Sequence, residues 1–195
     1  MSLEHILLGM LRAPSTGYDL GKQFAEAPAH FWFAERSQIY PMLKRMESQG
    51  LLRRSDAPSE RGPRRQVYET TEVGREALRD WLRGGPKIGR ERLGYVAQTF
   101  FLGELGDLRE SRRIIKQMRS EWAQKVARLE LAELQTSEEH GDLAQLDAND
   151  FHHYAALRMG LSTHRARIAW CDETIKQLDE RIAAIHPEPV GEEQR

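Results

Sequence analysis

The sequence predicts a mainly α-helical protein with a small β wing. An N-terminal winged helix-turn-helix domain precedes a C-terminal domain of long helices that dimerises in an antiparallel manner. Three observations support this fold class. The first 84 residues have the pattern helix, helix, helix, strand, loop, strand and helix. Gly84-Gly85-Pro86 then interrupts the pattern, and an apolar heptad runs through the last quarter of the chain.

These features predict three segments. Residues 1–84 are expected to form the winged helix-turn-helix domain, and residues 90–186 are expected to form the helical dimerisation domain. Residues 187–195 form a polar tail with almost nothing to bury, so the tail is expected to be disordered.

Two short helices are expected first. Apolar residues at helical spacing over residues 3–11 predict the first helix. Ser15 or Thr16 is the expected N-cap of the second helix, which ends before Pro28.

The third helix is expected to begin with Ser37 as its N-cap. Ile39, Leu43 and Met46 lie on one side of this helix and predict the face that packs on the core. Gly50 is expected to end the helix in a left-handed conformation.

After the third helix, the spacing of apolar residues changes from a helical to a strand-like period. Residues 51–54 and 66–70 predict two short strands, and the glycine and prolines between them predict a wing loop over residues 55–65. Thr71 then opens a fourth helix.

The second half of the chain is expected to be helical. A short helix is predicted over about residues 91–104, a long one after Asp107, and another after Asn149-Asp150. The polar stretch 136–148 is expected to be a loop that joins the two long helices into a hairpin.

The last helix has the most regular apolar pattern in the sequence. Its heptad predicts antiparallel packing against a second copy, because a hairpin of this length exposes more apolar surface than one chain covers. A bundle within one chain is the alternative. The residues expected at the dimer interface are Trp122, Leu157, Leu161, His164, Ile168, Cys171, Ile175, Leu178 and Ile182.

Charge is distributed unevenly along the chain. The net charge is −1, yet residues 36–65 carry eight basic and three acidic residues, a local charge of +5 that suits nucleic-acid phosphates. No apolar run approaches the roughly 20 residues of a membrane span, and a single cysteine favours the cytoplasm. The sequence has no metal-ligand spacing, nucleophile motif or phosphate loop, so no metal, cofactor or enzymatic activity is expected.

The third helix and the wing carry the chemistry that DNA binding needs. The N-terminal end of such a helix contacts base edges in the major groove, its cations neutralise phosphates, and wing arginines suit the minor groove. The residues expected to contact DNA are Tyr18, Ser37, Gln38, Tyr40, Lys44, Arg45, Arg61, Arg64 and Arg65.

These residues belong to a longer pattern that resembles the PadR family of transcriptional regulators. Its most specific element is Ile39-Tyr40-Pro41-x-Leu43, followed by Gly50-Leu51. The resemblance is close over residues 3–83 and continues only in kind beyond them. One departure is Gln38, where many members carry glycine, which bears on base preference. The segments that carry the resemblance are residues 7–11, 17–20, 37–51, 62–68 and 71–75.

The resemblance implies a homodimer that binds a pseudo-palindromic operator in double-stranded DNA, usually as a repressor. Many members of the family release DNA when a small aromatic or lipophilic compound binds. The aromatic residues expected to line such an effector pocket are Trp81, Phe100, Phe101, Trp122, Tyr154 and Trp170, with ordinary core and dimer packing as the other interpretation. The alternative function is a helical protein-interaction module that uses the winged-helix fold without binding DNA.

Overall fold

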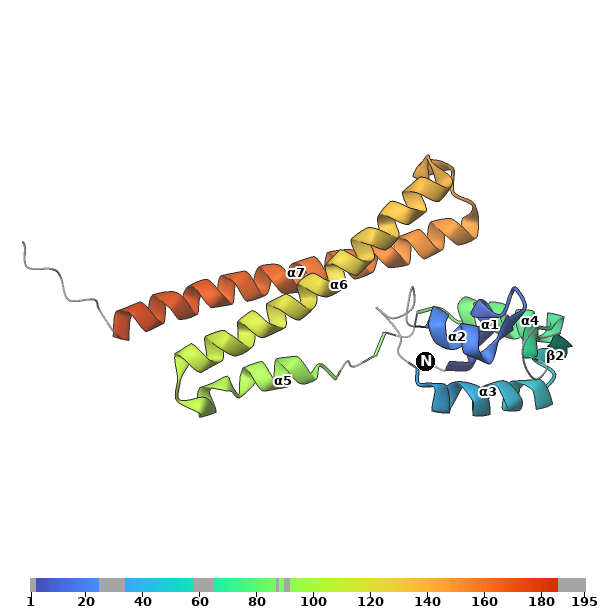
Figure 1. Cartoon of the computed structure of the whole chain (residues 1–195), viewed down its shortest axis with the longest axis horizontal. Coiled ribbons are helices and arrows are strands. Elements are labelled where there is room, and N and C mark those ends of the chain that lie inside the picture. The colour runs from blue at the N-terminus through green and yellow to red at the C-terminus, as the bar shows by residue number, and fades with distance from the viewer. Residues whose placement is uncertain (1–2, 25–33, 58–64, 87, 90–91, 186–195) are drawn as a thin grey trace, which may run out of the picture. The chain divides into compact units, whose positions relative to one another are not determined.

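The computed structural model divides the chain into two compact units, residues 1–90 and 91–195 (Figure 1). Arg61, Arg64 and the predicted disordered tail lie outside the described residues. Within the described part of the chain, no helix is both long and apolar enough to cross a membrane. The structure describes residues 3–24, 34–57, 65–86, 88–89 and 92–185.

The first unit is a winged helix with a three-stranded antiparallel sheet of order β1-β3-β2. The prediction lacked β1, because a strand of two residues has no period to detect. It is defined by its pairing with β3, in which Thr16 lies opposite Val67. The elements are α1 (Leu3–Met10), β1 (Ser15–Thr16), α2 (Gly17–Gln23), α3 (Arg36–Ser48), β2 (Leu52–Ala57), β3 (Arg65–Thr70) and α4 (Glu72–Arg83).

The core of this unit confirms the predicted buried face of α3. Ile39, Leu43 and Met46 are fully buried and pack with Leu7 and Leu8 of α1. Burial of each large apolar side chain contributes roughly 1.5–3 kcal/mol, so this face fixes α3 on the unit and leaves its other face toward solvent.

The start of α3 differs from the prediction. Its N-cap is Glu35 and not Ser37. Gln38 Oε1 accepts a hydrogen bond of 3.1 Å from the Glu35 backbone N–H, as in a capping box, while the Ser37 hydroxyl donates to Glu35 Oε2 at 3.2 Å. The end of α3 is as predicted, with Gly50 at φ +72°.

The second unit is built on a hairpin of two long helices, which lie side by side in Figure 1. The first of them begins directly after Asp107, as predicted, and Asp107 caps it by accepting a hydrogen bond from the Arg109 backbone N–H. The elements are α5 (Gly94–Phe100), the 3₁₀ helix η2 (Leu102–Leu105), α6 (Leu108–His140), the 3₁₀ helix η3 (Leu143–Gln145) and α7 (Ala148–Ile185).

The connection between the two long helices is shorter than the predicted loop over residues 136–148, because α6 continues to His140 and α7 already begins at Ala148. The stretch is polar, but Glu138 and Glu139 are good helix formers. The polar residues 136–140 therefore belong to the exposed end of α6 and not to an irregular connection.

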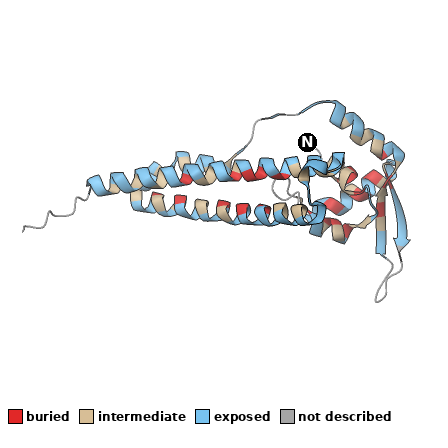
Figure 2. Ribbon diagram, turned by 90° about the horizontal axis from the view of Figure 1, so that it is seen from above, coloured by how far each residue is buried: buried red, intermediate tan, exposed pale blue. Residues whose placement is uncertain are grey.

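Part of the α7 heptad is buried against α6 of its own chain, which is the alternative arrangement for these positions. Leu161 and Cys171 are fully buried, and His164 is 4% exposed. Figure 2 shows buried positions recurring along both long helices. Trp122 and Leu157 are likewise buried, whereas Ile168, Ile175, Leu178 and Ile182 are partly buried.

Ion pairs across the hairpin are consistent with its antiparallel register. Arg165 bonds Glu130 at 2.7 Å, and Arg158 bonds Glu133 at 2.8 Å. Because both pairs join α7 to α6, they favour the same antiparallel alignment as the apolar heptad between them.

Candidate nucleic-acid interface

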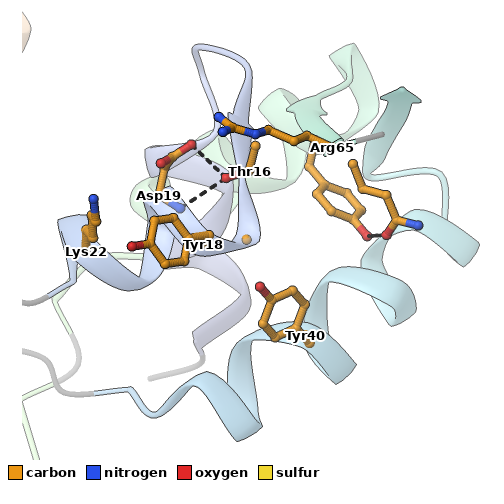
Figure 3. A pocket seen from close by; sticks show the side chains of 9 residues that line it. Thr16, Tyr18, Asp19, Lys22, Tyr40 and Arg65 are labelled. Carbon is orange, nitrogen blue, oxygen red and sulfur yellow. Dashed lines mark hydrogen bonds between the residues drawn. The ribbon is translucent and has the colours of Figure 1, made fainter. Parts of the chain in front are cut away.

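A hollow of about 540 Å³ opens where the start of α2, the exposed face of α3 and the start of β3 meet (Figure 3). It brings together three predicted DNA contacts, Tyr18, Tyr40 and Arg65. We call it the α2–α3 pocket. Its lining residues are Thr16, Gly17, Tyr18, Asp19, Lys22, Tyr40, Arg65, Gln66 and Tyr68.

Thr16 determines how the chain enters this pocket. Its side-chain oxygen caps α2 by accepting a hydrogen bond of 3.1 Å from the Asp19 backbone N–H. The same hydroxyl donates to Asp19 Oδ2 at 2.6 Å. The Asp19 carboxylate is therefore engaged within the turn.

Two exposed tyrosines form the mouth of the pocket. Tyr18 projects from α2 and is 51% exposed, and Tyr40 projects from α3 and is 45% exposed. Lys22 Nζ lies 4.8 Å from the centroid of the Tyr18 ring. A cation and two phenol groups thus point outward from neighbouring helices.

Tyr40 takes its position because residue 17 is glycine. A Cβ atom on Gly17 would lie only 2.6 Å from Tyr40 Cε1 and 3.1 Å from Tyr40 Cζ. The absence of a side chain lets the phenol ring lie directly against the start of α2.

Gly17→Ala is expected to displace the Tyr40 ring and to weaken DNA binding several-fold, with little change in melting temperature because the ring moves into solvent. Equilibrium gel-shift titration beside thermal unfolding measures both quantities. Tyr40→Phe removes only the hydroxyl and should give a comparable loss. Unchanged affinity in both variants would show that Tyr40 does not contact DNA.

The cations of the winged-helix unit fall into two groups. Lys22, Lys44 and Arg65 form no ion pair with any residue that the structure describes. The paired cations include Arg45, whose guanidinium lies 2.5 Å from Glu4, and Arg53, which lies 2.6 Å from Glu69. An unpaired cation can neutralise a phosphate without losing a protein partner.

Arg45, which is also expected to contact DNA, belongs to the paired group. Its side chain is half exposed but bonded to Glu4 of α1, so a contact with DNA requires that bond to break or to be shared. Lys44, one residue earlier, has no such competitor among the described residues. Lys44 is therefore the stronger candidate on this half of α3.

The inner wall of the pocket is neutral. Burial raises the pKa of Tyr68, and the nearby Glu47 carboxylate raises it further, so the phenol stays protonated at neutral pH. Its hydroxyl donates to Gln66 Oε1 at 3.2 Å. The positive charge of the pocket therefore comes from Lys22 and Arg65 at its rim.

Lys22 was missed by the sequence prediction. A lone lysine on a short helix is most often a solvated side chain. The available signal was its spacing of four residues from Tyr18, which places both on one face of α2.

Of the six aromatic residues expected to line an effector pocket, Trp81 lies in the first unit, and the five of the second unit do not gather in one cluster. Trp81 packs within the winged-helix unit, where its ring stacks on His5 at a centroid distance of 4.9 Å. In the hairpin, Trp122 and Tyr154 belong to different apolar clusters. The remaining three, Phe100, Phe101 and Trp170, are exposed.

The chemistry of the α2–α3 pocket is that of binding. Lysine, arginine and tyrosine side chains all donate hydrogen bonds to phosphate oxygens. Within the described residues, no group of three or more His, Cys, Asp or Glu side chains is placed to hold a metal ion.

Comparisons with known proteins agree with this chemistry. The model of the transcriptional regulator PadR-like family matches residues 6–80, and the model of the virulence activator alpha C-terminal region matches residues 98–179. The chain is 27% identical over 183 residues to the negative transcriptional regulator PadR of Bacillus subtilis, which covers 91% of this chain and 97% of that protein.

Two solved structures show the same fold. Bacillus subtilis PadR in complex with operator DNA gives a TM-score of 0.76 at 24% identity, over 90% of this chain and 98% of that one. The same protein in complex with p-coumaric acid gives a TM-score of 0.71 at 24% identity, over 91% and 98%. The likeness therefore extends through both units.

Proposed function

Because the chain belongs to the PadR-like family of transcriptional regulators, we propose that it represses transcription by setting the α2–α3 pocket against the phosphates of an operator. The observation that carries this proposal is the pair of cations at the rim, Lys22 and Arg65. Neither forms an ion pair within the described residues, and both flank exposed phenol groups. Such donors fix the register of a protein on DNA but do not read sequence.

Sequence reading is assigned to the exposed face of α3. Lys44 is suited to guanine edges, and the amide nitrogen of Gln38 is suited to a base acceptor while its oxygen caps the helix. Arg61 and Arg64 of the wing are proposed to add contacts at the flanking minor groove.

The operator is proposed to be two-fold symmetric because the chain offers a second apolar surface for a partner copy. Ala155, Met159, Ser162, Ala166 and Trp170 follow one another at spacings of four, three, four and four, and all are exposed. We call this surface the outer α7 strip. It carries no charge, and its small residues permit close helix approach, so antiparallel pairing with the same strip of a second copy would cover it.

A small aromatic compound is proposed to release the operator, as supported by the relative that was solved with p-coumaric acid. A regulator of this kind acts in the cytoplasm, and we propose no catalytic role. The alternative of a protein-interaction module has no comparable support, because the similar proteins are described as transcriptional regulators.

Selection from a pool of random DNA duplexes tests the proposed function. The full chain is expected to enrich a two-fold symmetric sequence whose half-sites are separated by about one helical turn or a multiple of it. A matched selection with a Lys22→Ala/Arg65→Ala chain should enrich the same sequence, but more weakly at the same protein concentration. Failure of the unaltered chain to enrich any sequence would contradict operator binding.

A further inference from the structure

A hydrogen bond fixes the orientation of the Gln38 amide at the start of α3. Gln38 Oε1 accepts this bond from the Glu35 backbone N–H at 3.1 Å. Because a backbone N–H only donates, the atom of the amide that faces it is the oxygen and not the nitrogen. The Gln38 side chain is exposed, so the amide nitrogen is the end that it offers to a partner outside the protein.

The N-terminus of α3 depends on this bond. Glu35 is the N-cap, with an extended backbone at φ −80° and ψ 153°, so its N–H has no acceptor within the helix. Gln38 lies at the third helical position, where a capping box places the side chain that accepts from the N-cap N–H. The orientation of the Gln38 amide is therefore part of how the helix begins.

The capping bond restricts which bases the amide can recognise. A glutamine recognises adenine by a bidentate contact, in which the amide nitrogen donates to N7 and the amide oxygen accepts from the N6 amino group. Gln38 Oε1 is already engaged at the helix N-terminus, so this contact competes with the capping bond. Guanine presents two acceptors, N7 and O6, and thymine presents O4, so both can be bound by the amide nitrogen alone.

We propose that the Glu35 backbone N–H restricts Gln38 to donating, so that Gln38 selects guanine or thymine over adenine at the operator base that it faces. Glu35 is thus a positioning residue for base recognition. Lys44 and Arg45 carry only donors and so add no acceptor for the adenine amino group. This inference rests on the proposed function and deepens it from operator binding to base preference.

Selection from random DNA duplexes with substituted chains tests the proposal. Glu35→Pro removes the backbone N–H, and the φ of −80° at this position suits a proline. Glu35→Ala is the matched control, because it removes the same carboxylate but keeps the N–H. The base that faces Gln38 is identified as the one whose preference disappears in a Gln38→Ala chain.

The unaltered chain and Glu35→Ala are expected to prefer guanine or thymine at that base. In Glu35→Pro the oxygen of Gln38 is released and completes the bidentate contact, so the ratio of adenine to guanine should rise at least fivefold over that of Glu35→Ala. Gln38→Glu keeps an acceptor for the cap but has no donor, so its preference for guanine should be lost. This second variant decides the question if Glu35→Pro does not fold.

Three results would overturn the proposal: preference of the unaltered chain for adenine at this base, equal base preferences in Glu35→Pro and Glu35→Ala, and full guanine preference in Gln38→Glu. If the unaltered chain enriches no sequence, the proposed operator function fails and this inference fails with it. If it enriches a two-fold symmetric operator with adenine at the base that faces Gln38, only the inference fails.

Discussion

The Lys22→Ala/Arg65→Ala double variant is expected to bind operator about 10–100-fold more weakly than the unaltered chain at physiological salt. The two side chains carry the rim charge of the α2–α3 pocket, and neither has a carboxylate partner among the described residues. Their loss removes four positive charges from a dimer on its operator. Fluorescence anisotropy with labelled operator measures the change.

A control with the same loss of charge is available on α4. Arg79 and Arg83 are exposed and pair with Glu76 at 2.5 and 2.6 Å. Arg79→Ala/Arg83→Ala therefore changes the net charge equally but removes cations that already have partners. If both double variants lose the same affinity, the effect belongs to overall charge and the pocket has no special role.

Met159→Glu/Ala166→Glu is expected to have the largest effect on assembly. Two carboxylates in the outer α7 strip would face those of a second copy, so the chain should become monomeric in analytical ultracentrifugation. A dimer gains from the second half-site by effective concentration, and losing it should reduce operator affinity by about 10²–10⁴-fold.

Lys116→Glu is the control for this variant, because it also adds negative charge to an exposed position of the hairpin but lies on α6. It should stay dimeric with unchanged affinity. A dimer that survives Met159→Glu/Ala166→Glu would place the interface elsewhere. A monomeric variant with full operator affinity would contradict the requirement for two copies.

Helix α3 shows which features the local sequence can predict. The buried side of α3 followed from the spacing of Ile39, Leu43 and Met46, since three fully buried positions share one helical face. The first residue of α3 could not be predicted from this spacing. Glu35 and Gln38 close the N-terminus between them, and a serine nearby looked like the more usual cap.

The heptad of α7 shows a feature that the local sequence could not predict. A repeat at positions such as Leu161 and Cys171 predicts that a helix covers them. Whether that helix belongs to the same chain depends on the length of α6. The end of α6 could not be predicted, because its last residues are polar and were interpreted as part of a loop. The outer α7 strip was overlooked because alanine and serine give a weak hydrophobic signal.

The binding site could be predicted only in part, because its residues meet through tertiary contacts. Tyr18, Tyr40 and Arg65 were predicted from their places on the helices and the wing, yet their common pocket depends on tertiary contacts, such as Gly17 against Tyr40. The ion pair of Arg45 with Glu4 joins residues 41 positions apart. A local sequence pattern therefore cannot predict this ion pair.

The salt dependence of operator binding tests the central claim most directly. Each phosphate contact contributes about 0.9 to the slope of log affinity against log salt concentration. If Lys22 and Arg65 bind phosphates in both copies, the Lys22→Ala/Arg65→Ala chain should have a slope shallower by about 3 to 4 units. Parallel lines for the variant and the unaltered chain would contradict phosphate binding by the α2–α3 pocket.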